Sequence, residues 1–149
     1  MPFWKNARPS TTMADVDPNL SEQIFLQLAA ARYLSVATTR RDGREILTPV
    51  WAVALGGRLY CYTAIDTGKV KRVRRTGQAR LSSCDLRGGK RGEWHACRAS
   101  IVSDADLSQR VFTALRQKYG WQMRLADFLA WCGRRLRQRA VLEFELLAP

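Results

Sequence analysis

The sequence predicts a mainly β protein, a small antiparallel barrel of six strands, closed or partly closed, with helices at its periphery. Short segments rich in β-branched and aromatic residues recur along the 149-residue chain, as strands do. Turn signals such as Asp42-Gly43 and Gly56-Gly57 separate them at the spacing of hairpins. Strands and helices do not alternate regularly, so a doubly wound parallel sheet is disfavoured.

The first predicted element is a short amphipathic helix. Ile24, Phe25 and Leu28 recur at helical spacing. Asn19 or Ser21 would cap this helix, because both side chains accept hydrogen bonds from open backbone N–H groups.

The segment before this helix shows no periodicity. We therefore expect a flexible tail over residues 1–16 and one cofactor-binding domain over residues 17–149. Met13 is an alternative natural start of the protein.

Two strands joined by a tight turn follow the helix. Residues 33–39 are rich in strand formers, and Asp42-Gly43 is a strong hairpin signal. The chain then returns as a second strand over residues 45–53. Pro49 within this strand predicts a bulge or an edge position, because proline has no N–H group to give to a ladder.

The middle of the chain continues with two more strands around a short helix. Gly56-Gly57 makes a turn into the third strand, residues 58–63. A basic helix is predicted over residues 69–75, and the fourth strand over residues 78–84. The fifth strand is predicted over residues 93–102.

The last third of the chain predicts two helices and a closing strand. Asp104 opens the first of these helices, and Gly120 ends it. Its apolar side chains lie on one side: Leu107, Val111, Leu115 and Tyr119. A second helix is predicted from about residue 122 to residue 137, and the sixth strand over residues 139–147.

Positive charge dominates the composition, since 25 Lys and Arg stand against 13 Asp and Glu for a formal net charge of +12. Such an excess favours an anionic partner. No apolar run is long enough to span a bilayer, and no signal peptide is expected. The four cysteines form no CxxC pair, so we expect a reduced, cytoplasmic protein. Because His95 is the single histidine, no zinc site is expected.

The segment 59–72 carries the strongest functional signal. It runs from a strand through a small polar loop into a basic helix start. Thr63 and Thr67 offer hydroxyl groups. Lys69 and Lys71 offer ammonium groups, and the helix start offers free backbone N–H groups. These groups would converge on a phosphate, which beside a sheet usually belongs to a nucleotide or a flavin-type cofactor.

Several short motifs, taken in order, carry a resemblance to a known family. They are Tyr33-Leu34-Ser35-Val36-Ala37-Thr38-Thr39 with Asp42-Gly43, Thr48-Pro49-Val50-Trp51, Leu59-Tyr60-Cys61-Tyr62-Thr63, Thr67-Gly68-Lys69-Val70-Lys71-Arg72, Ser83-Cys84-Asp85 and Gln117-Lys118-Tyr119-Gly120. Across residues 19–147 the chain resembles the flavin-binding split β-barrel proteins, the pyridoxamine-phosphate-oxidase-like superfamily. Within it, the chain is similar to the actinobacterial branch of F-420-dependent oxidoreductases. The resemblance implies a six-stranded antiparallel split β-barrel, FMN-binding-like in its fold.

The resemblance also implies a set of cofactor-binding residues: Thr48, Pro49, Val50, Trp51, Tyr62, Thr63, Thr67, Gly68, Lys69 and Lys71. The first four would lie along the cofactor ring, and Tyr62 and Thr63 would close over the cofactor chain. The others would hold the phosphate, with Lys71 as a helper to Lys69. Gly68 departs from the family pattern, which often has an arginine at this position.

The function implied is hydride transfer from reduced F-420 to a small electron-poor acceptor, such as an activated alkene, a quinone or a nitro compound. The enzyme would be a homodimer with its sites at the subunit interface. No catalytic residue is identified, and water or a tyrosine would supply the proton. The segment 143–147 lacks the Arg and His with which vitamin-oxidase members hold their substrate, so pyridoxamine phosphate oxidation is not expected.

Two other functions remain open. One keeps the fold and replaces F-420 by FMN. The other is a non-catalytic binder of an anionic tetrapyrrole or of nucleic acid, although nucleic acid is not expected because the sequence has no recognition-helix or RNA-binding motif. No nucleophile–base–acid set is visible, which suits a redox enzyme whose cofactor carries the chemistry.

Some of the aromatic residues also have simpler structural interpretations. Trp51 either contacts the cofactor ring or packs in the core or a dimer interface. Tyr119 and Trp121 either cover a substrate pocket or pack between helices. His95 is interpreted as a structural histidine in a strand.

Overall fold

A computed structural model describes residues 18–85, 89, 92–132 and 139–148. It contains seven strands: β1 (Tyr33–Thr39), β2 (Glu45–Val50), β3 (Ala52–Leu55), β4 (Arg58–Ala64), β5 (Gln78–Cys84), β6 (His95–Ile101) and β7 (Arg139–Leu146). The helices are α1 (Pro18–Ala30), α2 (Gly68–Thr76), α3 (Ala105–Tyr119) and α4 (Trp121–Cys132). The predicted tail over residues 1–16 lies outside the described residues.

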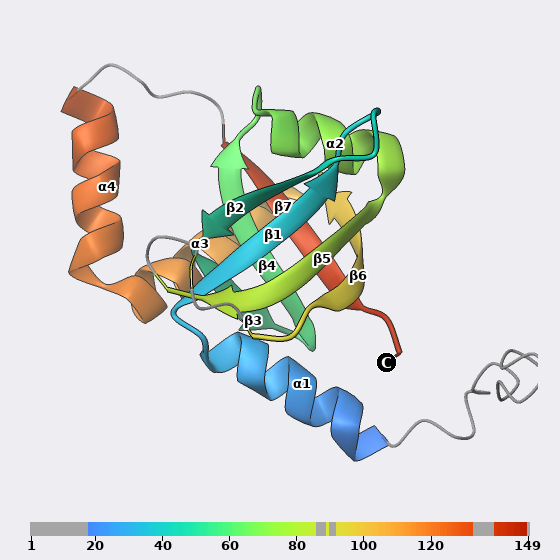
Figure 1. The fold of residues 1–149 in the computed structure, drawn as a ribbon. Helices are drawn as coiled ribbons and strands as arrows, with labels where there is room; N and C mark the ends of the chain where they lie inside the picture. Colours follow the sequence, from blue (N-terminus) through green and yellow to red (C-terminus); the bar gives the residue numbers. More distant parts are fainter. Residues whose placement is uncertain (1–17, 86–88, 90–91, 133–138, 149) are drawn as a thin grey trace, which may run out of the picture.

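All seven strands belong to one antiparallel sheet in the order β2-β1-β5-β6-β7-β4-β3. β2 and β3 lie at opposite edges of this order, yet only Trp51 separates them in the chain. The two edges therefore have to meet at Trp51, and the sheet curls into a half-barrel with helices around it (Figure 1). The predicted mainly β fold with peripheral helices is confirmed.

The number of strands differs from the prediction because the expected second strand is divided at Trp51. Its first part pairs with β1, ending with Val50 opposite Leu34. Its second part pairs with β4, beginning with Ala52 opposite Cys61. One continuous strand cannot reach both edges of a curled sheet, so the chain bends between them. Pro49 lies in β2, an edge strand, where a missing N–H group is tolerated.

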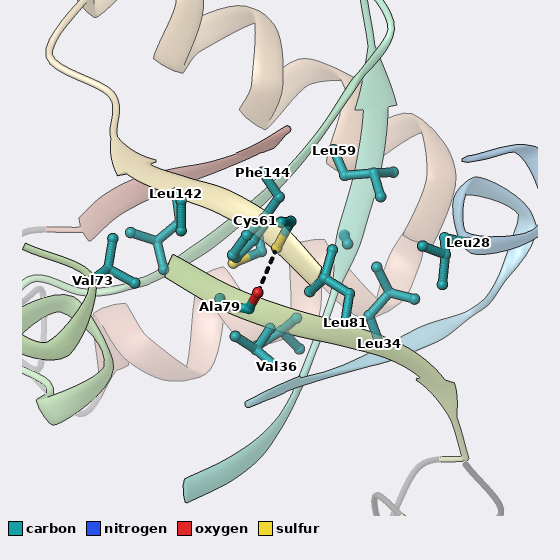
Figure 2. Packing of buried hydrophobic residues seen from close by; sticks show 14 of the residues in the cluster. Leu28, Leu34, Val36, Leu59, Cys61, Val73, Ala79, Leu81, Leu142 and Phe144 are labelled. Carbon is teal, nitrogen blue, oxygen red and sulfur yellow. Dashed lines mark hydrogen bonds between the residues drawn. The ribbon is translucent and has the colours of Figure 1, made fainter. Parts of the chain in front are cut away.

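The interior of the half-barrel holds the larger hydrophobic cluster. Its bulkiest fully buried members from the strands are Leu34, Leu59, Leu81, Leu142 and Phe144. α1 contributes Leu28, and α2 contributes Val70 and Val73. Figure 2 shows these strand side chains converging. The dashed line in it ends at the carbonyl of Ala79, which accepts a hydrogen bond from the Cys97 thiol at 3.2 Å. α2 is therefore fixed to the barrel by its own apolar side.

A second cluster joins α3 to the outside of the sheet. β4 and β7 contribute Tyr60 and Val141, and α3 contributes Val111, Leu115 and Tyr119. Alternation along a strand explains the two clusters, because neighbouring residues point to opposite faces. Among the described residues, no helix reaches the length and hydrophobicity that a membrane span needs.

Two helix ends differ in how well the sequence predicted them. α1 begins at Pro18, so Asn19 and Ser21 lie inside the helix and the predicted cap is wrong. Proline is favoured at the first helical position, where its missing N–H group would have no partner anyway. Asp104 does cap α3, since its carboxylate accepts hydrogen bonds from the N–H groups of Asp106 and Leu107 at 2.9 and 3.4 Å. The predicted helix over residues 122–137 corresponds to α4, and its last part lies outside the described residues.

Asp104→Ala is expected to lower the free energy of unfolding by about 1 kcal/mol, because two N–H groups at the start of α3 lose their acceptor. The melting temperature should fall by roughly 2–4 °C for a domain of this size. Asp106→Ala is the matched control, because Asp106 also lies in the first turn but its carboxylate is not the cap. Calorimetry on both variants checks this, and equal melting temperatures would contradict it.

Candidate functional site

The candidate site lies where β4 passes into α2. β4 ends at Ala64, and a tight turn places the N–H of Thr67 3.2 Å from the carbonyl of Ala64. α2 then begins at Gly68, so Lys69 lies in its first turn. The ammonium of Lys69 donates to the hydroxyl of Thr63 at 3.4 Å, and the Thr63 and Thr67 hydroxyls are also 3.4 Å apart. The structure thus brings these three predicted phosphate-binding side chains together.

The start of α2 leaves backbone donors open. Thr67 occupies the N-cap position with an extended backbone, but its side chain makes no capping hydrogen bond. Its hydroxyl donates to the carbonyl of Ala64 instead, at 2.9 Å. No acidic residue lies in the first turn of α2. The positive end of the helix dipole and the first-turn N–H groups, which Thr67 does not cap, would therefore favour an anion here.

Lys69 is buried without a counter-ion. Only 8% of the residue is exposed, and no ion pair among the described residues includes it. Burial lowers the pKa of Lys69, and the nearby charge of Arg72 lowers it further, whereas Cys61 acts in the opposite direction. A buried ammonium is costly when it is unpaired. A bound anion would supply the missing partner.

Next to Lys69 the surface opens into a cavity of about 300 Å³. It is lined by Tyr33, Pro49, Val50, Trp51, Tyr62 and Lys69. Three of the four residues predicted to lie along the ring therefore line one cavity with Tyr62 and the buried ammonium. The two edges of the sheet meet at Trp51, and we call this junction the seam. Residues of β2 and β4 come together at the seam.

Thr48 does not line this cavity. It lies further from the seam along β2, opposite Val36 of β1. Tyr33 lines the cavity but was not among the predicted site residues. The sequence signal for Tyr33 is its position at the start of the first strand, yet only the antiparallel register places that end of β1 beside the end of β2.

Aromatic packing holds the walls of the cavity. Trp51 stacks on Tyr119 with ring centroids 4.9 Å apart and planes 14° from parallel. Tyr62 packs against Phe112 at 5.6 Å, and the guanidinium of Arg139 lies 5.3 Å from the centroid of the Tyr62 ring. Trp51 therefore both packs on α3 and lines the cavity. Tyr119 is buried in helix packing, whereas Trp121 is 70% exposed.

Gly68 and Lys71 line a different cavity from Lys69. This second cavity, of about 330 Å³, lies between α2 and the turn that joins β1 to β2. Lys71 is exposed there. The structure thus separates Lys71, the predicted helper, from the ammonium of Lys69.

The described residues offer little acid–base or metal chemistry near the cavity. They contain no group of three or more His, Cys, Asp or Glu that could hold a metal ion. Burial raises the pKa of Cys61 and of Cys97 to about 12, so both thiols stay protonated at neutral pH. His95 lies in β6 and lines another cavity, of about 780 Å³, with residues of α1 and β7. What the site of Lys69 can do is bind an anion beside an aromatic surface.

Comparison with known proteins agrees with this fold. A family model described as pyridoxamine 5'-phosphate oxidase matches residues 20–147. No curated protein sequence matches the chain at a significant level. A conserved hypothetical protein from Mycobacterium tuberculosis has a similar structure, with a TM-score of 0.65 and 19% identity over 92% of this chain and 86% of that one.

Two further structures have the same fold. The heme storage protein HutZ from Vibrio cholerae gives a TM-score of 0.63 and 17% identity, over 90% of this chain and 92% of that one. A protein from Bacteroides thetaiotaomicron, provisionally assigned to 5-nitroimidazole antibiotic resistance, gives a TM-score of 0.59 and 13% identity. This match covers 87% of this chain and 80% of that one. At these identities each likeness shows the fold alone. The family model, however, spans nearly all of the described residues, and the chain belongs to the pyridoxamine 5'-phosphate oxidase family.

Proposed function

We propose that the protein is a cytoplasmic, homodimeric oxidoreductase that uses F-420 to reduce a small electron-poor organic acceptor, such as an activated alkene, a quinone or a nitro compound. The observation that carries this proposal is the buried ammonium of Lys69, unpaired among the described residues, at the edge of the aromatic cavity. A cofactor with a tricyclic ring and a phosphate arm fits that combination of groups.

The residues present fit such a cofactor in three respects. Lys69, the hydroxyl of Thr63 and the open first turn of α2 would hold the phosphate. Trp51 and Tyr62 would support the ring, because both are fixed by packing against α3. Pro49 has no N–H group, so at this position the wall would offer the ring no backbone donor. When bound, F-420 supplies the hydride, and the chain contributes binding, orientation and electrostatics.

Exposed apolar side chains support the proposed homodimer. Trp121, Leu125 and Phe128 of α4 are 70%, 46% and 57% exposed. Their spacing places them along one side of the helix. A second copy of the chain would cover this apolar side, since contiguous exposed apolar surface is typical of an interface.

FMN is the alternative cofactor in the same cavity, because the fold also includes flavin-binding oxidoreductases. Heme is a second candidate, since HutZ shares the fold and His95 lines the cavity of about 780 Å³ with apolar residues of α1 and β7. In that case the protein would store or carry a tetrapyrrole rather than transfer a hydride.

Side-by-side titration with F-420, FMN and hemin tests the proposal. We expect colourless purified protein whose melting temperature rises with F-420, by an amount corresponding to about 2.7 kcal/mol at a ligand concentration of 100 Kd. A yellow protein that keeps its flavin would favour FMN. A heme absorption band that disappears in His95→Ala would favour the tetrapyrrole. No stabilisation by F-420 would contradict the proposed function.

A further inference from the structure

The second cavity beside α2 is unusually basic. It is lined by Arg40, Arg41, Asp42, Gly68, Lys71, Arg72 and Arg75. Arg40 and Arg41 come from the β1–β2 turn, whereas the last four residues come from α2. Five cationic side chains therefore surround about 330 Å³ with a single acidic residue among them.

That acidic residue offsets only part of the positive charge, since its main partner is Arg44 and it also interacts with the charge of Arg40. The carboxylate of Asp42 accepts hydrogen bonds from the backbone N–H of Arg44 at 3.0 Å and from its guanidinium at 2.9 Å. Arg44 also lowers the pKa of Asp42 through these bonds. The ion pairs formed among the described residues include none of the five cations of the cavity. The repulsion is felt at Arg72, because burial, Arg40 and Arg75 all lower its pKa.

Gly68 makes room for the Arg72 guanidinium. A Cβ atom at Gly68 would lie 2.6 Å from one terminal nitrogen of Arg72 and 3.3 Å from its central carbon. The Nε of Arg72 donates to the hydroxyl of Thr38 at 2.7 Å, which fixes the direction of the side chain. No other side-chain hydrogen bond of Arg72 occurs among the described residues, so both terminal nitrogens remain available. The guanidinium is thus held against the first turn of α2.

We propose that this cavity is an anion-binding site for a second phosphate or carboxylate group, with Arg72 as its central ligand and Lys71, Arg40 and Arg75 as supporting charges. The planar fork of a guanidinium suits two parallel hydrogen bonds to such a group. Because Gly68 and Lys69 are consecutive, the site adjoins the first turn that carries the other anion site. One ligand with two anionic groups reaches both, or a separate anion occupies this one.

The anion site stands on its own geometry, and only its assignment to the cofactor depends on the proposed function. Pyrophosphate is the first probe, titrated into the full chain at constant ionic strength. Arg72→Met should weaken its binding at least tenfold. Arg74→Met is the matched control, because Arg74 is exposed on the same helix and lines neither cavity; its effect should stay below twofold. Equal losses in the two variants would overturn the proposal, since the charge would then act as a diffuse field.

Two further variants guard against misfolding. Arg72→Lys keeps the charge without the fork, so it should restore part of the affinity. Gly68→Ala should weaken binding by displacing the guanidinium, although residue 72 itself is unchanged. Binding by Gly68→Ala and Arg72→Met at the wild-type level, with melting temperatures near the wild type, would also overturn the proposal.

Cofactor titrations separate the two sources of the anion. If Arg72→Met weakens F-420 binding but not FMN binding, the second anionic group belongs to the carboxylate tail of F-420. If it weakens only pyrophosphate binding, a separate anion occupies the site. Pyrophosphate binding that depends on Arg72 without any binding of F-420 would support the anion site while refuting the proposed function. If F-420 binds, and neither F-420 binding nor pyrophosphate binding depends on Arg72, the result would support the proposed function and refute the anion site.

Discussion

Lys118→Met is expected to lower the free energy of unfolding by about 3 kcal/mol, because three carbonyl oxygens lose their charged donor. The ammonium of Lys118 donates to the carbonyls of Ala29, Ala31 and Ala52 at 3.1, 2.9 and 2.7 Å. All three donor positions of the ammonium are thereby used. These bonds join the end of α1 and the start of β3 to the end of α3.

Tyr119 continues the same connection. Its hydroxyl donates to the carbonyl of Arg32 at 2.7 Å and accepts from the N–H of Ala52 at 3.0 Å. Burial raises the pKa of Tyr119 to about 12, so the hydroxyl keeps its proton at neutral pH. Trp51, the residue that joins the two edges of the sheet, stacks on this ring. Losing the Lys118 bonds therefore loosens the seam that also forms a wall of the cavity.

Urea denaturation compares Lys118→Met with Lys71→Met, which changes an exposed lysine by the same substitution. Lys118→Met should have a clearly lower urea midpoint, with an unchanged slope of unfolding free energy against urea concentration. The midpoint of Lys71→Met should stay near that of the wild type. Methionine keeps much of the apolar stem of lysine, so the difference reports the hydrogen bonds. Identical midpoints would mean that water replaces the ammonium at no cost.

Local signals explain why most of the fold could be predicted from the sequence. Strand formers bounded by turn residues gave the bounds of β1 and β5 as the structure has them. Asp104 and Gly120 gave the ends of α3, because capping depends on neighbouring residues only. The division of the second strand at Trp51 could not be predicted. β2 and β3 each pair with the neighbouring strand along the chain, β1 and β4. They lie at opposite edges of the sheet only because of the order of all seven strands, which no local signal carries.

In the candidate site, too, residues close in the sequence could be predicted and residues far apart could not. Lys69, Thr63 and Thr67 lie within seven residues of one another, so the sequence alone brought them together. The cationic contribution of Arg40 was not predicted, because it lies in a hairpin turn 28 residues before Gly68. The role of Gly68 could not be predicted either, because the sequence showed only that a glycine stands where the family often has an arginine. In the structure the missing side chain makes room for Arg72, one helical turn later.

Lys69→Met is expected to weaken binding of the phosphate-bearing cofactor by roughly 10–100-fold, since a charged hydrogen bond to the ligand contributes about 1.5–3 kcal/mol. The same variant should raise the melting temperature of the ligand-free protein, because it removes a buried ammonium that has no counter-ion among the described residues. Titration calorimetry and thermal denaturation measure the two effects.

Arg74→Met is the control, because Arg74 is an exposed cation on the same helix. This substitution should change neither the cofactor affinity nor the melting temperature appreciably. A loss of affinity accompanied by a loss of stability would indicate a structural role for Lys69 instead.

The pH dependence of cofactor affinity gives Lys69 a signature that packing alone would not. Burial lowers the pKa of Lys69 below its ordinary value, whereas a bound phosphate would raise it. Affinity should therefore be constant at pH values below the pKa of the free protein and fall as the pH rises through it. Arg72 stays charged over this range, and the thiol of Cys61 stays neutral because its pKa is about 12. The decline should begin at a lower pH than an exposed lysine would give, and it should vanish in Lys69→Met. If the affinity of Lys69→Met declines with pH as steeply as that of the wild type, another group is responsible for the titration.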